Sequence, residues 1–250
     1  MVRATICLMI SSLFHAFIYA PLYNGLVYFV GAVSSHDVGI AVILLTIVVR
    51  IIIYPLSRRA VKAQADMKKV APLIEKLKEK YKDNREEQSR RIFALYREHD
   101  VHPFAGFLLV LVQFPVLIGL YWVFSHGGLP AIDTKDLYSF VSVPSTVNME
   151  FLGLINMGGH SIVLAVLAAI TQFLYTRLSL GPKKEHTIES ESSFSSDMAK
   201  SLDTQARYVL PAIIGVVAYS VVAAAPLYWV TSNSFMILQE YLAGRRFRDT

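Results

Sequence analysis

One arginine lies inside an apolar segment, where a charge is costly. Arg50 falls within the run 39–56, which is otherwise mostly aliphatic, and Thr46 precedes it by one helical turn on the same face. One interpretation is that the side chain snorkels to the membrane surface near Pro55 and Arg58. The other places the guanidinium in a wet cavity shared with other polar groups, because charges inside a membrane usually face a bundle interior. There it would meet acidic or polar groups.

Other apolar segments carry isolated polar or aromatic residues that could face the same cavity. They are Gln113 before Pro115, Gln172 with Thr176 four residues later, and Asn233 with Trp229 four residues earlier. Considered individually, each of the polar residues could instead form hydrogen bonds between neighbouring helices. Trp229 could instead belong to the aromatic belt at the membrane surface. Taken together with Arg50, the set favours a shared hydrophilic cavity.

The sequence contains none of the common catalytic or metal-binding motifs. It has no G-x-S-x-G, H-E-x-x-H or Walker loop, and its seven histidines and one cysteine are not spaced as metal ligands. We therefore expect neither an enzyme nor a cofactor.

Composition and hydrophobic patterning predict an all-α integral membrane protein. Hydrophobic residues make up 54% of the 250 residues and charged residues 17%, against about 25% charged in a typical soluble chain. Five apolar runs are long enough to cross a bilayer, and they lie at 39–56, 104–124, 161–178, 208–225 and 226–243. The last two meet at Ala225-Pro226, where we expect a tight turn. The prediction is a bundle of five transmembrane helices.

Basic residues set the expected orientation. Thirteen of the 24 Lys and Arg residues lie in 58–102, five in 177–207 and three in 244–250, whereas the opposite side holds Arg3 and Lys135. Positive loops stay in the cytoplasm, so the N-terminus is expected outside and the C-terminus in the cytoplasm. Because the charges are clustered between apolar runs, the net charge of +5 points to a membrane rather than to DNA.

The hydrophilic stretch after the first span has the pattern of a helical hairpin. Apolar residues recur at spacings of three and four in its first arm, as in a packing seam, and a second seam follows a charged turn at 82–85. The members are Met67, Val70, Ile74, Leu77 and Tyr81 in the first arm and Ile92, Leu95, Tyr96 and His99 in the second. Pro72 should kink or restart the first arm. The hairpin is either a solvated connector between two spans or a basic arm that contacts anionic lipid, RNA or a partner protein.

The N-terminal segment is expected to be an uncleaved helix lying in the membrane interface. Arg3 and the apolar run to Phe14 resemble a signal peptide, but no A-x-A cleavage site follows. Pro21, Asn24 and Gly25 interrupt the next apolar run, in which Leu22, Leu26 and Phe29 recur at helical spacing. A cleaved signal or an extra span are the alternatives.

These predictions divide the chain into ten segments. Residues 1–35 form the N-terminal apolar helix, and the five spans lie at 36–57, 104–125, 161–178, 207–225 and 226–243. The first two spans are joined by a cytoplasmic hairpin at 58–103, and the next two spans follow an outer loop at 126–160 and a cytoplasmic linker at 179–206. A cytoplasmic tail at 244–250 ends the sequence.

Several of these segments together resemble the YidC/Oxa/Alb family of membrane protein insertases, in the short form found in bacteria. The segments that carry the resemblance are the arginine-containing span ending in Tyr54-Pro-Leu56, Pro72–Lys82, Leu95–His99 with Pro103, Gln113-Phe-Pro115, Ile170–Phe173 and Leu227–Asn233. They cover about residues 20–243 in the family's order. An arginine inside a first span, followed by a charged hairpin, is a specific combination.

The resemblance implies an insertase of the bacterial plasma membrane whose spans enclose a hydrophilic groove open to cytoplasm and lipid. Arg50 would supply the positive charge of the groove, Thr46 matches its polar neighbour, and Trp229 falls where the last span carries an aromatic that contacts substrate. Nascent membrane proteins and the lipid bilayer are the implied partners, with the ribosome and the Sec translocon as further candidates at the hairpin. A small anion transporter or channel that uses Arg50 as its binding site is the alternative function, and a structural scaffold is a third.

Overall fold

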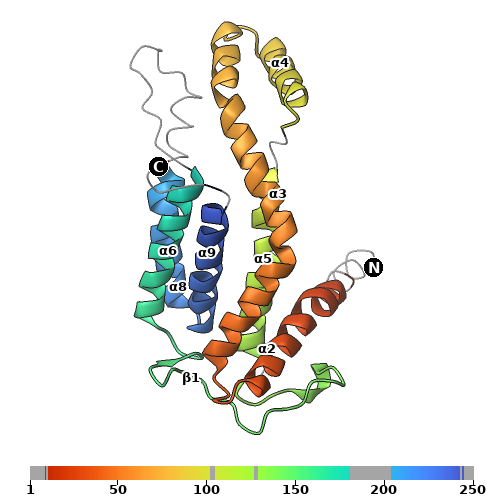
Figure 1. Ribbon diagram of the computed structural model, residues 1–250, viewed down its shortest axis with the longest axis vertical. Helices are drawn as coiled ribbons and strands as arrows, with labels where there is room; N and C mark the ends of the chain where they lie inside the picture. The colour runs from red at the N-terminus through yellow and green to blue at the C-terminus, as the bar shows by residue number, and fades with distance from the viewer. Residues whose placement is uncertain are drawn as a thin grey trace. The chain divides into compact units, whose positions relative to one another are not determined.

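The computed structural model of the chain is mostly helical (Figure 1). It describes residues 9, 11–101, 105–126, 129–180, 204–242 and 244. The chain forms two compact units, of which the first comprises 1–50 with 116–250 and the second comprises 51–115. Each unit is described by itself below.

Helices occur at all five predicted spans. They are α3 (Val38–Lys80), α5 (Ala105–His126), α6 (Ile162–Leu180), the pair η3 (Gln205–Val209) and α8 (Leu210–Ser220), and α9 (Ala224–Leu242). Within the first unit, α6 packs against α8 and α9 (Figure 1). Its face toward α8 is lined by small residues, since Ala165 and Ala168 are buried against Ala218. Small residues let helix backbones approach closely in a membrane.

Three helices of the described part of the chain are long and apolar enough to cross a membrane. They are Ser11–Ala32, Val38–Arg59 and Ile162–Leu180, and Phe114–Ser125 is a shorter apolar helix. Two of the three coincide with predicted spans. The third is the N-terminal segment, for which an interfacial position was expected, and its length and composition suit a span as well.

Two prolines that interrupt apolar runs are accommodated by widened helical turns. The π-helical η1 (His15–Tyr19) directly precedes α2 (Ala20–Ala32), whose second residue is Pro21, and η3 directly precedes Pro211 of α8. A proline lacks an N–H and its ring clashes with the carbonyl four residues earlier, so an interior proline breaks a regular α-helix. A π turn shifts the hydrogen-bond pattern at that point, and the helix continues.

The second unit contains the far part of α3 and α4 (Arg85–Glu98), which folds back after a turn (Figure 1). The α3 helix runs through Pro72 to Lys80 instead of restarting there. Gln88 of α4 closes the turn by donating to the Lys78 carbonyl at 2.9 Å. Of the predicted seam, Val70 is buried and His99 is exposed, and the other members are half-buried.

The turn between α8 and α9 lies a few residues before the predicted position. The α8 helix ends at Ser220 and α9 begins at Ala224, so Pro226 is the third residue of α9 instead of part of the turn. The reason is that the first N–H groups of a helix have no intrahelical partner, so a proline there costs no hydrogen bond.

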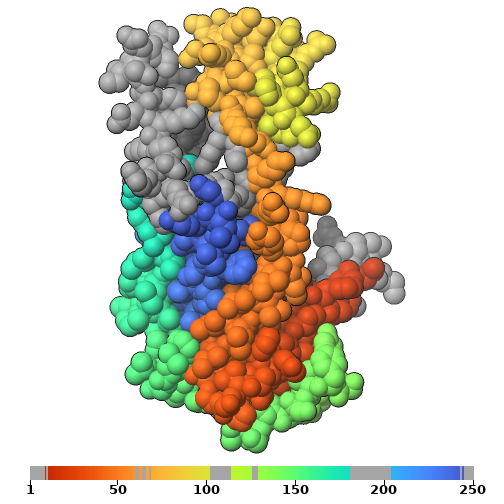
Figure 2. Space-filling model, in the orientation of Figure 1, coloured from red at the N-terminus to blue at the C-terminus, as the bar shows by residue number. Residues whose placement is uncertain are grey.

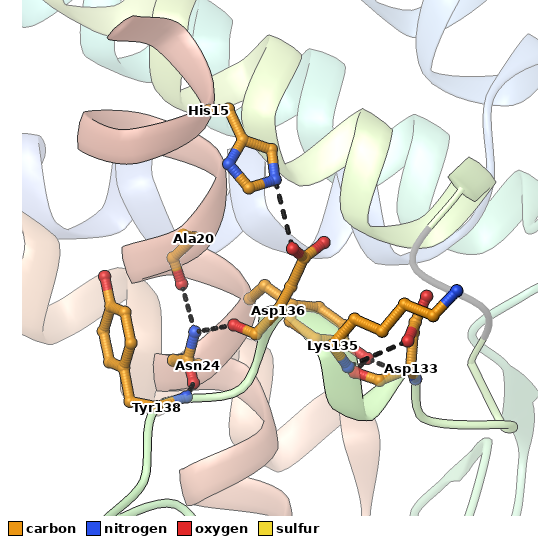
Figure 3. Close-up of polar contacts among 8 residues, drawn as sticks. His15, Ala20, Asn24, Asp133, Lys135, Asp136 and Tyr138 are labelled. Carbon is orange, nitrogen blue, oxygen red and sulfur yellow. Dashed lines mark hydrogen bonds and ion pairs between the residues drawn. The ribbon is translucent and has the colours of Figure 1, made fainter. Parts of the chain in front are cut away.

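The segment 129–160 carries η2 (Thr134–Asp136) and a small antiparallel hairpin of β1 (Glu150–Phe151) and β2 (Ile155–Asn156). Asn24 of α2, which is 2% exposed, fixes its first part (Figure 3). The Asn24 amide donates 2.8 Å hydrogen bonds to the Ala20 and Asp136 carbonyls and accepts from the Tyr138 amide at 2.6 Å. His15 and Asp136 approach to 3.4 Å beside it (Figure 3). The residue that seemed to interrupt the helix thus anchors the connecting segment.

Candidate functional site

The centre of the candidate site is Arg50, the twelfth residue after the start of α3. Its side chain is 5% exposed and is directed toward α9. The Nε atom donates to the Ser232 hydroxyl at 2.9 Å, and Nη2 donates to the same oxygen. The guanidinium is therefore held inside the first unit by a second helix.

Two tyrosines complete the surroundings of the guanidinium. Tyr228, one turn before Ser232 on α9, is 2% exposed, and Tyr175 of α6 is half-buried. Both interact electrostatically with Arg50. We call Arg50, Tyr175, Tyr228 and Ser232 the arginine cluster. It draws on three helices, α3, α6 and α9, and the groups named here around the guanidinium are hydroxyls.

A second polar group lies between α6 and α9. The Asn233 amide donates to the Gln172 side-chain carbonyl at 3.1 Å and to the Thr171 hydroxyl at 3.4 Å, and Gln172 donates to the Thr176 hydroxyl at 3.1 Å. We call Thr171, Gln172, Thr176 and Asn233 the amide cluster. The structure thus brings together the predicted residues Gln172 and Asn233, with hydrogen bonds between helices.

The remaining predicted residues have different surroundings. Thr46 is 1% exposed, and its hydroxyl donates to the Val42 carbonyl of its own helix at 2.6 Å. Trp229 is half-buried and packs against the alanines at the contact between α6 and α8. Gln113 lies on α5, but its side chain is outside the described part of the chain.

Sequence reasoning missed Ser232, the residue that holds Arg50. The position of Ser232 on α9 could have identified it, because buried side chains recur on one face of this helix at 225, 228, 232, 236 and 239. A polar residue on the buried face of a span needs a hydrogen-bond partner. Asn233, one position on, turns toward α6, so the two polar clusters occupy different faces of α9.

The arginine cluster offers a positive charge and several hydroxyl groups, which is the chemistry of a binding site for polar or anionic groups. Among the residues that the structure describes, no group of three or more His, Cys, Asp or Glu side chains lies close enough to hold a metal ion. A buried guanidinium with hydroxyl partners attracts anionic groups, above all carboxylates, because charge-assisted hydrogen bonds are stronger than neutral ones. The arginine cluster is therefore suited to an acidic or polar group that enters the membrane.

Replacing Asn233 should test the amide cluster as a structural contact. We expect Asn233→Leu to lower the free energy of unfolding by about 0.6–1.7 kcal/mol, the range found for side-chain hydrogen bonds inside membrane bundles. Thermal unfolding in detergent would measure the change. The control is Ser234→Ala, because Ser234 is an exposed neighbour whose hydroxyl donates to Val230 of its own helix. Equal stability of Asn233→Leu and the unmodified protein would contradict the expectation.

Comparison with known proteins supports a specific family. The family model described as "60Kd inner membrane protein" matches residues 28–250. The chain is 30% identical, over 92% of its own length and 98% of the relative, to a membrane protein insertase YidC from Fusobacterium nucleatum. It is also 28% identical to the YidC of Francisella philomiragia and 29% identical to that of Francisella tularensis subsp. novicida, in each case over 85% of this chain.

The relatives differ in length. The chain spans nearly all of the Fusobacterium protein but about a third of the length of the two Francisella proteins. The match with the longer relatives therefore concerns a part of each of them.

Proposed function

Because this chain belongs to the YidC/Oxa/Alb family, the family of the 60Kd inner membrane protein, we propose that it is a membrane protein insertase of the bacterial plasma membrane. Its clients are nascent membrane proteins, and its second partner is the lipid bilayer. The observation that carries the proposal is the buried Arg50, held by Ser232 between apolar helices. A charge in that position raises the free energy of insertion into the membrane, and charged residues inside spans usually mark a functional site.

The proposed role of Arg50 is to reduce the cost of bringing polar groups into the membrane. An aspartate at the centre of a spanning helix costs about 2.5–3.5 kcal/mol. A client's acidic tail or short polar hairpin would enter a hydrophilic groove and pass the guanidinium, which compensates the carboxylate charge while the tail is away from bulk water. Within the first unit, Thr46, Gln172, Trp229 and Asn233 are proposed to line the same groove.

Release into lipid supplies the driving force. Once the polar tail has crossed, the apolar segment of the client leaves the groove sideways and is buried among lipid tails. Each buried CH₂ contributes about 0.8 kcal/mol, so a segment of ordinary length needs no nucleotide hydrolysis. The membrane potential would assist translocation of acidic tails.

The helical hairpin of α3 and α4 is proposed to be the element that receives clients. It carries thirteen basic and eight acidic residues between 58 and 102, and its exposed charges suit contacts with the ribosome, the Sec translocon or anionic lipid. Phe93, which is 59% exposed, gives the charged surface of α4 an apolar point of contact for a nascent chain.

The proposed orientation places the hairpin in the cytoplasm and the segment 126–160 outside. Cysteines substituted for Lys78 and Lys135 test it, because both lysines are exposed in the structure. In a variant without Cys7, an impermeant thiol reagent added to intact cells should label position 135 and spare position 78. Labelling of position 78 with protection of position 135 would reverse the orientation.

The function itself can be tested in cells depleted of their own YidC-type insertase. Expression of this chain should restore growth and the insertion of a reporter membrane protein. An empty vector gives the background, and a matched level of the chain in the membrane must be verified. Normal accumulation of the chain without any restoration of insertion would count against the proposal.

A further inference from the structure

The tip of the β1–β2 hairpin exposes large apolar side chains at a turn. Phe151 pairs with Ile155, so the connecting loop is Leu152, Gly153 and Leu154. Leu152 is 63% exposed and Leu154 is 82% exposed. Loops of this length in water usually carry polar residues and glycine, so two exposed leucines in a three-residue loop call for an apolar environment.

The backbone of the tip is held in a strained conformation at Leu152. Leu152 has a φ of +52° and Gly153 a φ of +69°. Glycine adopts the left-handed region freely, whereas leucine in that region is strained. The fold nevertheless places a leucine there, with its side chain directed away from the protein.

Every N–H group of the tip already has a partner inside the protein. The Leu152 amide donates to the Asp37 carboxylate at 2.9 Å, the Gly153 amide to the Glu150 carbonyl at 3.3 Å, and the Leu154 amide to the Phe151 carbonyl at 3.0 Å. Groups that enter a membrane must be satisfied internally, because hydrocarbon offers no hydrogen bonds. The N–H groups of the tip meet this condition.

The base of the hairpin is firmly attached to the ends of the helices. A Cβ added to Gly39, at the start of α3, would lie 2.3 Å from the Phe151 ring, so ring and helix are in close contact. On the other side, the Gly159 carbonyl accepts from the Ala223 amide at 2.7 Å, and the Met157 carbonyl accepts from the Ala224 amide at 3.2 Å. The hairpin is thus fixed at the level where α3, α6 and α9 begin.

The apolar tip continues an apolar helix surface. Ile162 and Val163, the first residues of α6, are 66% and 57% exposed, and further exposed aliphatic residues follow along this candidate span at 166, 167, 170 and 174. In Figure 2 the green atoms of the segment around residue 155 lie directly against the end of α6. A span presents such a face to lipid, so the same lipid lies next to the hairpin.

A charged residue limits how deep the tip can lie. Glu150, at the base of the hairpin, is exposed and accepts a hydrogen bond from the Asn156 amide at 3.0 Å. The loop 152–154 itself has no charged or polar side chain. This distribution fits a shallow position, with leucines among the upper acyl chains and the carboxylate at the headgroups.

We propose that Leu152 and Leu154 anchor this hairpin in the adjacent leaflet of the membrane and thereby hold the end of the helical bundle at a fixed depth. The occupant of the apolar surface is lipid, since the surface continues the lipid-facing side of α6. The anchor is independent of client insertion and does not rest on the role of Arg50.

Fluorescence quenching in vesicles tests the anchor directly. In a Cys7→Ser background, an environment-sensitive nitrobenzoxadiazole label is attached to Leu154→Cys, and the protein is reconstituted in phosphatidylcholine–phosphatidylglycerol vesicles. Leu167→Cys on α6 is the lipid control, and Ser145→Cys on the same connecting segment is the water control. Nitroxide lipids labelled near the headgroup and deeper in the chain report lipid contact, and iodide on both sides reports water.

We expect the label at position 154 to be quenched several-fold more by the shallow nitroxide lipid than the label at position 145, and several-fold less by iodide. Quenching by iodide as strong as at position 145 would overturn the proposal. Protection from both quenchers would also overturn it, because a protein would then cover the tip.

A second variant controls for the possibility that the fluorescent label itself draws the hairpin tip into the membrane. Leu152→Asn leaves the Phe151 contact and the backbone hydrogen bonds of the hairpin in place, but removes half of the apolar tip. With this change, the label at position 154 should shift measurably from nitroxide quenching toward iodide quenching. An unchanged quenching pattern would mean that Leu152 does not anchor the hairpin and would refute the proposal.

Discussion

Arg50→Ala should reduce the insertion of clients with acidic translocated tails about tenfold or more. At an effective dielectric constant near 20, two opposite charges 4 Å apart attract by about 4 kcal/mol, and losing even 1.4 kcal/mol of that attraction gives a tenfold effect. Arg50→Lys should retain much of the activity because it keeps the charge. Insertion of two matched clients, one with an acidic and one with a neutral tail, measures the effect in each variant.

The matched control for Arg50 is Ser232→Ala. This change removes the hydroxyl that accepts from the guanidinium but leaves the positive charge, so most of the activity should remain. If Arg50 serves as a snorkelling residue, Arg50→Ala should instead be neutral, or should stabilise the span by up to about 2.5–3.5 kcal/mol, with no dependence on the client. Equal insertion of both clients by Arg50→Ala and the unmodified protein would rule out the proposed role of the charge.

Deletion of residues 67–96, bridged by a short Gly/Ser linker, should leave the protein in the membrane but abolish most of its insertion activity. The ion pairs described for the hairpin each lie within a single helix, so they do not fix one arm to the other. Lys69 pairs with Asp66 at 2.8 Å and Arg91 with Glu87 at 2.7 Å, and exposed pairs of this kind contribute about 0–1 kcal/mol. The hydrogen bond from Lys69 lowers the pKa of the Asp66 carboxyl.

Membrane fractionation and alkali extraction would measure whether the deletion variant is integrated, and client insertion would measure its activity. Glu87→Gln is a suitable control, since it removes one exposed ion pair of α4 and should leave the activity unchanged. Normal client insertion by the deletion variant would reduce the hairpin to a connector between α3 and α5.

The sequence allowed prediction of features that depend on long periodic patterns. Apolar runs of sufficient length predicted helices at each of the five segments, and the seam from Met67 to Tyr81 with the polar turn predicted a return by a second helix. Gln172 and Thr176 were paired correctly because they are four residues apart on one helix, which is a local relation.

Features that depend on contacts between distant segments were not predictable in this way. In the sequence, Asn24 is a polar residue that interrupts an apolar run. In the structure it anchors the connecting segment through hydrogen bonds with Asp136 and Tyr138, which are 112 and 114 residues away in the chain. Ser232 has no distinguishing feature in the sequence, because its contact with Arg50 depends on how α9 packs against α3. Pro21 interrupts an apolar run in the sequence, but the helix continues through it after a π turn, and no local pattern in the sequence predicts this outcome.

The proposed function requires that this chain can move a client into the bilayer by itself. The direct measurement is reconstitution of the purified protein in liposomes, with a single-span client whose insertion is scored by protease protection. Without nucleotide, the client's spanning segment and tail should become protected in proportion to the amount of protein, well above protein-free liposomes. Protection no greater than in protein-free liposomes, together with anion uptake by the same vesicles, would contradict the proposed function and favour a transporter.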